Sequence, residues 1–452
     1  MFKYRQILFF LAVVFISSGC ALLEAPPRPV IPTPIPTVPP INTGATGELV
    51  VDPVSDIVPA VDPFVEALMN EVSQNQLVGY VQQLQSFGTR NTFSPTDRTD
   101  FGLGAARTWI FNEFVRVGNG RLQVEYDPFP LNYNGTVTDQ QNVVATLPGT
   151  GNHPGVVVLM AHYDSRSVDP NDGTSLAPGA NDNASGVAAM LEIARLLSSR
   201  NWNQTVVFIA FTAEEQGTYG SRHFVADRLL DGWQIDAAIN MDIVGGRPGI
   251  PQSIRMFAAG PDTTPQQQLA RYIDFVGALY APQFPPTLVN ATDREGRFSD
   301  HIRFLDAGIP AVRMIESVED QTRQHNALDT ADAIDYNYLR QVTQLNLAVL
   351  ANMIGAPTPA QPPIMAPMAD PGGIILSWNP DPLAAGYAIS FRPLGAEDYP
   401  PFRFVSGNQA GNVAITGLDT SIPYAVSIAA ISPSGLIGKF SPEIILEAQS
   451  TP

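Results

Sequence analysis

The sequence predicts an α/β domain built on a largely parallel sheet, followed by a small all-β domain. Two runs, 155–161 and 205–212, are almost continuously apolar, which is typical of strands covered on both faces of a sheet. Between them, 185–199 carries apolar side chains at helical spacing. Beyond residue 355 the pattern changes to short alternating runs such as 374–378. Strands that alternate with helices, followed by strands alone, favour this two-domain architecture.

The remaining elements follow from the same two periodicities. Helical spacing predicts helices over 65–87, 104–117, 219–230 and 336–353. Apolar and alternating runs predict strands over 142–147, 235–241, 253–258, 311–315, 386–392, 413–418 and 424–431. Helices fill the gaps between the strands of the first domain, as parallel strands require.

Proline-rich segments set the domain boundaries. Residues 21–62 contain PPRPVIPTPIPTVPPI, which favours extended chain and cannot form a packed core, so they are predicted to be a linker. A second linker, PTPAQPP, covers 357–363. These boundaries place the α/β domain at 63–356 and the all-β domain at 364–452.

Residues 1–20 have the form of an export signal. Lys3 and Arg5 precede ten apolar residues, 7–16, and small residues lead to Cys20. The apolar core is too short for a transmembrane helix, which needs about 20 residues. The segment resembles a bacterial lipoprotein signal, whose cysteine is lipidated. That implies a cell-envelope protein anchored to the membrane through Cys20, or a secreted protein if the signal is only cleaved.

The composition excludes other function classes. The net charge is −18, and Lys3 and Lys439 are the only lysines. Such a field repels a polyanion such as DNA, so no nucleic-acid partner is expected. Cys20 is the only cysteine, which excludes an intramolecular disulfide framework.

The all-β domain resembles a fibronectin type III module. Trp378 lies on an early strand, and Leu418 precedes Tyr424 by six residues. In that family the tryptophan packs centrally and the tyrosine lies at a strand corner. The resemblance implies a module that binds polysaccharide or protein, or one that serves as a spacer.

Histidines and acidic residues gather where the predicted strands of the first domain end. In chain order they are His162, Asp164, Asp182, Glu214, Glu215, Asp242 and His325. In open α/β sheets the carboxyl ends of the strands form the ligand-binding edge, so these side chains are expected to converge. The alternative is that each of these residues only caps a loop end or forms a hydrogen bond within the core. That alternative would require all of them to fall at predicted strand ends by chance.

Five of these residues make a sensible pair of metal sites. Asp182 can bridge two metals with its two oxygens, His162 and Asp242 complete one site, and Glu215 and His325 complete the other. Mixed nitrogen and oxygen ligands without thiolate suit zinc, with manganese or cobalt as substitutes. The sequence therefore predicts a site for two Zn²⁺ ions.

The two remaining residues have supporting roles. Asp164 lies two positions after His162, on the same side of an extended segment, where it can orient the ligating imidazole. Glu214 and Glu215 are neighbours that must point apart, so one binds metal and the other is free to act as a general base.

Several motifs resemble the dizinc aminopeptidases of the bacterial leucyl aminopeptidase and aminopeptidase Y kind. They are MAHYDS, GANDNASGVAAMLEIAR, FIAFTAEEQGTYGS, NMDIVG, FSDHIRFLDAGIPAV and QHNALDT, in the order of that family. The resemblance covers about residues 65–355. It implies a phosphorylase/hydrolase-like α/β/α sandwich with a mixed, mostly parallel central sheet.

The resemblance also implies an enzymatic activity and a role for each of the seven residues at the strand ends. The protein is expected to be an exopeptidase that hydrolyses N-terminal residues from peptides with two zinc ions. Its ligands are then His162, Asp182, Glu215, Asp242 and His325. The catalytic base is Glu214, and Asp164 orients a histidine. The chain departs from the family at Asn326, where threonine is frequent, and it lacks the disulfide of many secreted members.

Two alternatives remain open at this point. A glutaminyl-peptide cyclase shares MAHYDS and SDHIRFLDAGIP but uses one zinc ion and lacks the DNASG and TAEEQG forms. A non-catalytic binding protein on the same scaffold usually loses metal ligands. Arg297 and Ser299 are candidates for the substrate pocket, and a preference for apolar residues is the default expectation.

Overall fold

The computed structural model describes residues 48–368 and 372–448. The expected export signal, Cys20 and the first part of the expected linker, 21–47, lie outside the described residues. None of the helices in the described part of the chain is both long and apolar enough to cross a membrane.

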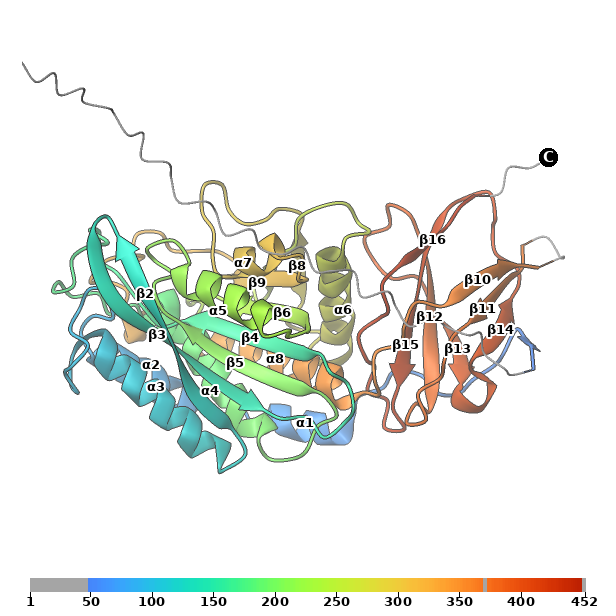
Figure 1. The fold of residues 1–452 in the computed structure, drawn as a ribbon, viewed down its shortest axis with the longest axis horizontal. Helices are drawn as coiled ribbons and strands as arrows, with labels where there is room; N and C mark the ends of the chain where they lie inside the picture. The colour runs from blue at the N-terminus through green and yellow to red at the C-terminus, as the bar shows by residue number, and fades with distance from the viewer. Residues whose placement is uncertain (1–47, 369–371, 449–452) are drawn as a thin grey trace, which may run out of the picture. The chain divides into compact units, whose positions relative to one another are not determined.

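An eight-stranded sheet forms the centre of the α/β domain (Figure 1). Its strands are β2 (Gln123–Tyr133), β3 (Thr136–Leu147), β4 (Val156–His162), β5 (Thr205–Phe211), β6 (Ile235–Met241), β7 (Ile254–Phe257), β8 (Pro286–Val289) and β9 (Ala311–Glu316). They lie in the order β2-β3-β5-β4-β6-β9-β7-β8. The central pairs β5/β4, β4/β6 and β6/β9 and the edge pair β7/β8 are parallel, whereas β2/β3, β3/β5 and β7/β9 are antiparallel. The predicted mixed, mostly parallel sheet is confirmed.

Helices cover both faces of this sheet. They are α1 (Pro63–Asn70), α2 (Gln74–Ser86), α3 (Gly102–Gly118), α4 (Ser185–Leu197), α5 (Tyr219–Leu230), α6 (Pro265–Tyr280), α7 (His301–Asp306) and α8 (Tyr336–Gly355). Along β4, Leu159 packs into the core that includes α2, α3, α4 and α8, while Met160 packs into the core with α5 and α7. Alternate side chains of a strand point to opposite faces, so a strand buried on both must be apolar throughout.

Two local features differ from the predicted elements. The helix expected over 65–87 is two helices, because Ser73 begins α2 as its N-cap and accepts a hydrogen bond from the Gln76 N–H, at 3.3 Å. The strand expected over 142–147 is the end of a longer hairpin, β2–β3. Its turn is Asn134-Gly135, both with positive φ (50° and 84°), which is a sequence signal for a tight hairpin.

The C-terminal domain consists of two four-stranded sheets, in the orders β1-β14-β11-β10 and β13-β12-β15-β16. The strands are β1 (Val50–Val51), β10 (Ile364–Pro367), β11 (Ile374–Ser377), β12 (Gly386–Pro393), β13 (Arg403–Ser406), β14 (Asn412–Ile415), β15 (Tyr424–Ile431) and β16 (Ile444–Leu446). Trp378 is fully buried between the sheets and packs edge-on against Tyr387, with ring centroids 5.3 Å apart.

The end of the predicted N-terminal linker is part of this domain. Val50 and Val51 pair in parallel with Val413 and Ala414, so β1 is an edge strand of the first sheet. Asp52 continues the contact through its carboxylate, which accepts a hydrogen bond from the Thr416 N–H at 2.8 Å. The proline-rich composition of 21–62 gave no signal for this pairing, because a two-residue edge strand depends on its partner and not on its own periodicity.

Candidate metal centre

The predicted site residues meet at one edge of the central sheet. His162 is the last residue of β4, and Glu214 and Asp242 follow the ends of β5 and β6. These three strands are parallel neighbours, so their carboxyl ends lie side by side. Asp182 lies in the turn before α4, and His325 lies in the loop between β9 and α8.

Five side chains form two groups that share one aspartate. His162 Nε2 lies 3.3 Å from Asp182 Oδ1 and 3.4 Å from Asp242 Oδ1. His325 Nε2 lies 3.2 Å from Asp182 Oδ2 and 3.3 Å from Glu215 Oε2. Within each group the candidate ligand atoms all lie within 4.8 Å of one another. The two oxygens of Asp182 thus face two different histidines, which is the arrangement expected of a bridging carboxylate.

The electrostatics of the cluster favour a positive charge at its centre. Burial lowers the pKa of His325, but the carboxylates of Asp182 and Glu215 outweigh burial and raise it to about 9. Burial raises the pKa of Asp182, but hydrogen bonds to His162 and His325 hold it well below its usual range. Each group therefore gathers negative charge around an imidazole, where a cation is stabilised.

The donor set fits zinc. Each group offers one imidazole nitrogen and two carboxylates, a combination that zinc binds in proteins. Glu215 Oε1 is buried and has no hydrogen-bond partner, although its other oxygen contacts His325 and Arg166. A buried carboxylate oxygen without a partner is costly unless a cation satisfies it. The residues present are therefore suited to hold two divalent ions.

Glu214 lies in the same cleft but outside both groups. Its side chain is only 9% exposed, and it lines the cleft beside Asp182, Glu215 and Asp242. Burial raises the pKa of Glu214 well above its usual value, and the charge of Asp242 adds to this effect while His162 opposes it. A carboxyl group that holds a proton more readily than usual is suited to take and return one.

Asp164 does more than the sequence predicted. Its carboxylate lies 3.5 Å from His162 Nδ1, whose shorter contact, 3.1 Å, is to the backbone oxygen of Asp164. The same carboxylate accepts the backbone N–H groups of Glu214 at 3.2 Å and Glu215 at 3.1 Å. Asp164 thus connects the end of β4 to the turn that carries both glutamates.

Two residues that the sequence analysis missed hold ligands in place. Asp329 accepts the backbone N–H groups of Asn181 at 2.8 Å and Asp182 at 2.9 Å. Arg313, fully buried in β9, donates through Nη2 to Asp242 Oδ2 at 2.8 Å. Sequence signals existed for both: Asp329 lies in the quoted motif QHNALDT, and Arg313 is the only charged residue of the predicted strand 311–315.

The two residues that the sequence suggested for the substrate pocket, Arg297 and Ser299, differ in whether they line the cleft. Arg297 lines the cleft, as the sequence suggested. Ser299 does not, because it is fully buried and accepts a hydrogen bond from Asn240 Nδ2 at 2.7 Å. His301, the histidine of the quoted motif that begins FSDH, was not among the candidates; it is buried as well, and its Nε2 donates to the backbone oxygen of Thr292 at 2.8 Å, which is a structural role.

Replacing Asp164 with asparagine is expected to weaken zinc binding by about 10- to 100-fold, the usual effect of altering a residue that orients a ligating histidine. The amide can accept only one of the two backbone N–H groups of Glu214 and Glu215, so the turn loses a restraint. Calorimetric titration of metal-free protein with zinc measures the change. Asp139→Asn, on an exposed position of β3, is the control, and equal affinities in the two variants would contradict the role of Asp164.

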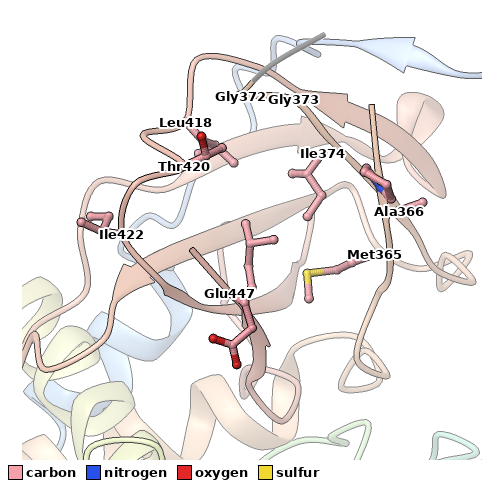
Figure 2. A pocket seen from close by; sticks show the side chains of 11 residues that line it. Met365, Ala366, Gly372, Gly373, Ile374, Leu418, Thr420, Ile422 and Glu447 are labelled. Carbon is pink, nitrogen blue, oxygen red and sulfur yellow. The ribbon is translucent and has the colours of Figure 1, made fainter. Parts of the chain in front are cut away.

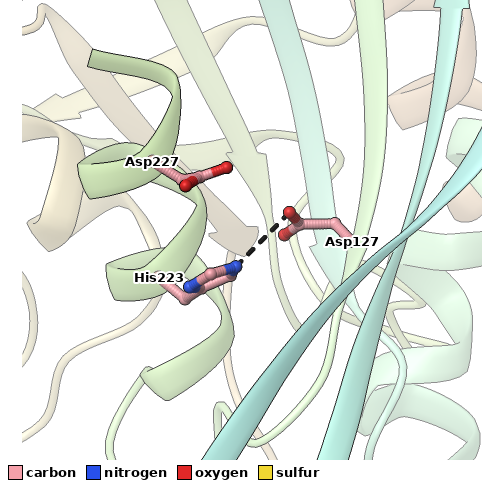
Figure 3. A group of neighbouring side chains, drawn as sticks. All are labelled: Asp127, His223 and Asp227. Atoms are coloured by element: carbon pink, nitrogen blue, oxygen red, sulfur yellow. Dashed lines mark ion pairs between the residues drawn. The ribbon is translucent and has the colours of Figure 1, made fainter. Parts of the chain in front are cut away.

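Two other features are weaker candidates for a functional site. A third group of potential ligands consists of Asp127, His223 and Asp227 (Figure 3). In this group Asp127 already accepts a hydrogen bond from Asn142 Nδ2 at 2.7 Å, and Arg228 Nη2 lies 3.8 Å from Asp127 Oδ1. A cavity of about 140 Å³ in the C-terminal domain (Figure 2) is lined mainly by apolar side chains and glycine, and Glu447 is the one charged lining residue among those that the structure describes. Neither feature shares a residue with the cleft that Asp182, Glu214, Glu215 and Asp242 line.

Comparison with known proteins agrees with the geometry of the site. The sequence profile of peptidase family M28 matches residues 142–350. A "Probable zinc metalloprotease" of Leptosphaeria maculans is 33% identical over 344 residues, which cover 66% of this chain and 78% of the relative.

Solved structures share the fold of the α/β domain. The LapA aminopeptidase of Legionella pneumophila has a TM-score of 0.53 at 20% identity, over 66% of this chain and 76% of that one. The glutaminyl cyclase of Porphyromonas gingivalis has a TM-score of 0.50 at 22% identity, over 62% of this chain and 98% of that one. At these identities the likeness shows the fold and not the reaction.

The sequence relatives establish the family to which the chain belongs. The similarity to the L. maculans protein extends over most of both chains, and the family profile covers the strands and loops that carry all five candidate ligands. The chain therefore belongs to peptidase family M28 and is a zinc metallopeptidase.

Proposed function

We propose that the protein is an exported aminopeptidase that releases N-terminal residues from peptides, with two zinc ions and Glu214 as the general base. The observation that carries the proposal is the sharing of Asp182 between two complete histidine–carboxylate groups. A site for a single zinc ion would leave one of the two groups without an ion to bind. Membership of a family of zinc metallopeptidases also supports it.

His162, Asp182 and Asp242 would hold one zinc ion, and Asp182, Glu215 and His325 the other. Zinc supplies Lewis acidity, which polarises the scissile carbonyl and lowers the pKa of water, and manganese or cobalt can substitute. Glu214 takes a proton from the attacking water and returns it to the leaving amine. Water thereby adds to the carbonyl carbon and the carbon–nitrogen bond breaks.

Mass spectrometry of a mixed peptide pool tests this function. The zinc-loaded full-length protein, held in detergent, is expected to remove single N-terminal residues, and acetylation of the peptides or addition of EDTA is expected to block the reaction. Cleavage inside acetylated peptides would contradict an aminopeptidase. Loss of ammonia from N-terminal glutamine, without hydrolysis, would identify a cyclase instead.

The same proposal includes the remaining parts of the chain. Export and a lipid anchor at Cys20 rest on the N-terminal sequence alone. A fibronectin type III nature of the C-terminal domain is supported by its two packed sheets, which are antiparallel except for the β1/β14 pair, and by the burial of Trp378 between them. Binding of polysaccharide or protein by that domain stays a prediction.

A further inference from the structure

Four arginines line the cleft of about 310 Å³ that opens over the metal centre. They are Arg166, Arg294, Arg297 and Arg303: Arg166 lies in the loop after β4, Arg294 and Arg297 lie in the loop between β8 and α7, and Arg303 lies in α7. The carboxylates that line the cleft within residues 48–368 and 372–448 are Asp182, Glu214, Glu215 and Asp242, which are the candidate ligands and the candidate base. Zinc ions would offset that negative charge, and the arginines would then dominate the field that a substrate meets.

Three of the four arginines already have carboxylate partners. Arg166 donates to Glu215 Oε2 at 2.9 Å, and Arg303 lies 3.1 Å from Asp306. Arg294 contacts Asp293 at 3.2 Å and also pairs with Glu319. The charges of Arg294 and Arg303 are therefore at least partly compensated by carboxylates outside the metal centre, whereas Arg166 shares Glu215 with a candidate metal group. These pairs also hold the arginine side chains in place around the cleft.

Arg297 is the exception. Its Nη1 donates to Gln324 Oε1 at 2.8 Å, and Gln324 is neutral. Among the described residues no carboxylate lies within ion-pair distance of Arg297, although its side chain is partly buried at the cleft wall. A guanidinium has five N–H donors, and most of those on Arg297 remain available. Gln324 precedes the candidate ligand His325, so this charge is held close to the reacting centre.

The apolar surface of the cleft is small. In the described part of the chain, Ile243 and Phe298 are its only large apolar lining residues, and Phe298 is 58% exposed. Such a wall offers little area to an apolar side chain, whose binding depends on the surface removed from water. The default expectation of an apolar preference therefore finds no support in the cleft. A guanidinium at a partly buried wall instead matches the planar, two-oxygen shape of a carboxylate.

We propose that the cleft selects peptides that carry a carboxylate beside the scissile bond, and that Arg297 binds this carboxylate. The proposal rests on the proposed aminopeptidase function. The carboxylate has two chemical sources: the side chain of an N-terminal glutamate or aspartate, or the terminal carboxylate of a dipeptide. Both place the same anionic group within one residue of the bond that breaks.

Matched substrate pairs that differ in one charge test the proposal. Values of kcat/KM are compared for Glu-Ala-Ala-amide against Gln-Ala-Ala-amide, and for Leu-Gly against Leu-Gly-amide, with the zinc-loaded full-length protein. The charged member of at least one pair is expected to be preferred by about 10- to 100-fold, the usual effect of a hydrogen bond to a charged group. The pair that shows the preference identifies the source of the carboxylate.

Variants connect the preference to Arg297. In Arg297→Gln the ratio within the preferred pair is expected to fall to near one, whereas Arg98→Gln, which removes an exposed arginine outside the cleft, keeps the wild-type ratio. Calorimetry measures ligand binding without turnover. The wild-type protein is expected to bind glutamate more tightly than glutamine, or glycine more tightly than glycinamide. Arg297→Gln is expected to lose this difference.

The outcomes separate the two proposals. Equal rates within both pairs, or a preference that survives in Arg297→Gln, would overturn carboxylate selection while leaving the aminopeptidase function in place. Failure to release an N-terminal residue from any of the four peptides would overturn the proposed function itself, and carboxylate selection with it.

Discussion

Replacing Glu214 with glutamine is expected to lower kcat by about 10²–10⁴-fold, the usual contribution of a general base. Glutamine has nearly the same size, and Glu214 belongs to neither group of candidate ligands, so zinc content is expected to stay at the wild-type level. The loss therefore falls on the chemical step and not on the assembly of the site. Steady-state kinetics together with elemental analysis of bound zinc measure both quantities on one preparation.

Glu295→Gln is the matched control for this variant. Glu295 is exposed and does not line the cleft, so the same chemical change at that position is expected to leave kcat within about twofold of wild type. Activity of Glu214→Gln close to that of the control would show that Glu214 is not the base. A fall in zinc content along with activity would assign it to the metal site instead.

Replacing Asp182 with asparagine is expected to remove metal from both groups at once. Only Asp182 belongs to both, with one oxygen facing each histidine, and an amide has a single oxygen and no charge. Zinc affinity is expected to fall by more than about 100-fold, beyond the effect of residues that only orient a ligand. Activity is expected to be lost with the metal.

Elemental analysis after dialysis against a weak chelator measures this loss, and Asp227→Asn is the control. Asp227 belongs to the third group, in which Asp127 is already occupied by other donors, so its replacement is expected to leave zinc content unchanged. Retention of both ions by Asp182→Asn would exclude a bridging role. Loss of one ion only would place Asp182 in a single site.

Much of the candidate site could be predicted because its residues follow strands with strong local patterns. The apolar runs that end at His162 and before Glu214 and Asp242 are parallel neighbours, and the ends of parallel strands coincide at one edge. Knowing that these runs are buried strands is therefore enough to bring their last residues together. The motifs of the two remaining ligands, Asp182 and His325, completed the set.

Local pattern was less informative where the elements depend on partners or caps. The break at Ser73 changes the path of the chain but hardly the apolar periodicity around it, so 65–87 resembled one helix. The edge strand at Val50 is fixed by Val413, more than 350 positions away. Neither feature is determined by the residues in its own window.

The sequence by itself determined the fold class and which residues could bind metal, since both depend on periodicity and on residue type at strand ends. Only the tertiary structure decided how those residues are supported: Asp164 holding the glutamate turn, Asp329 holding Asp182, and Arg313 paired with Asp242. It alone also decided that Arg297, a pocket candidate from the sequence, has no carboxylate partner among the described residues. Hydrogen bonds and ion pairs form between groups that are close in space, and the folded chain brings these groups together from loops far apart in sequence.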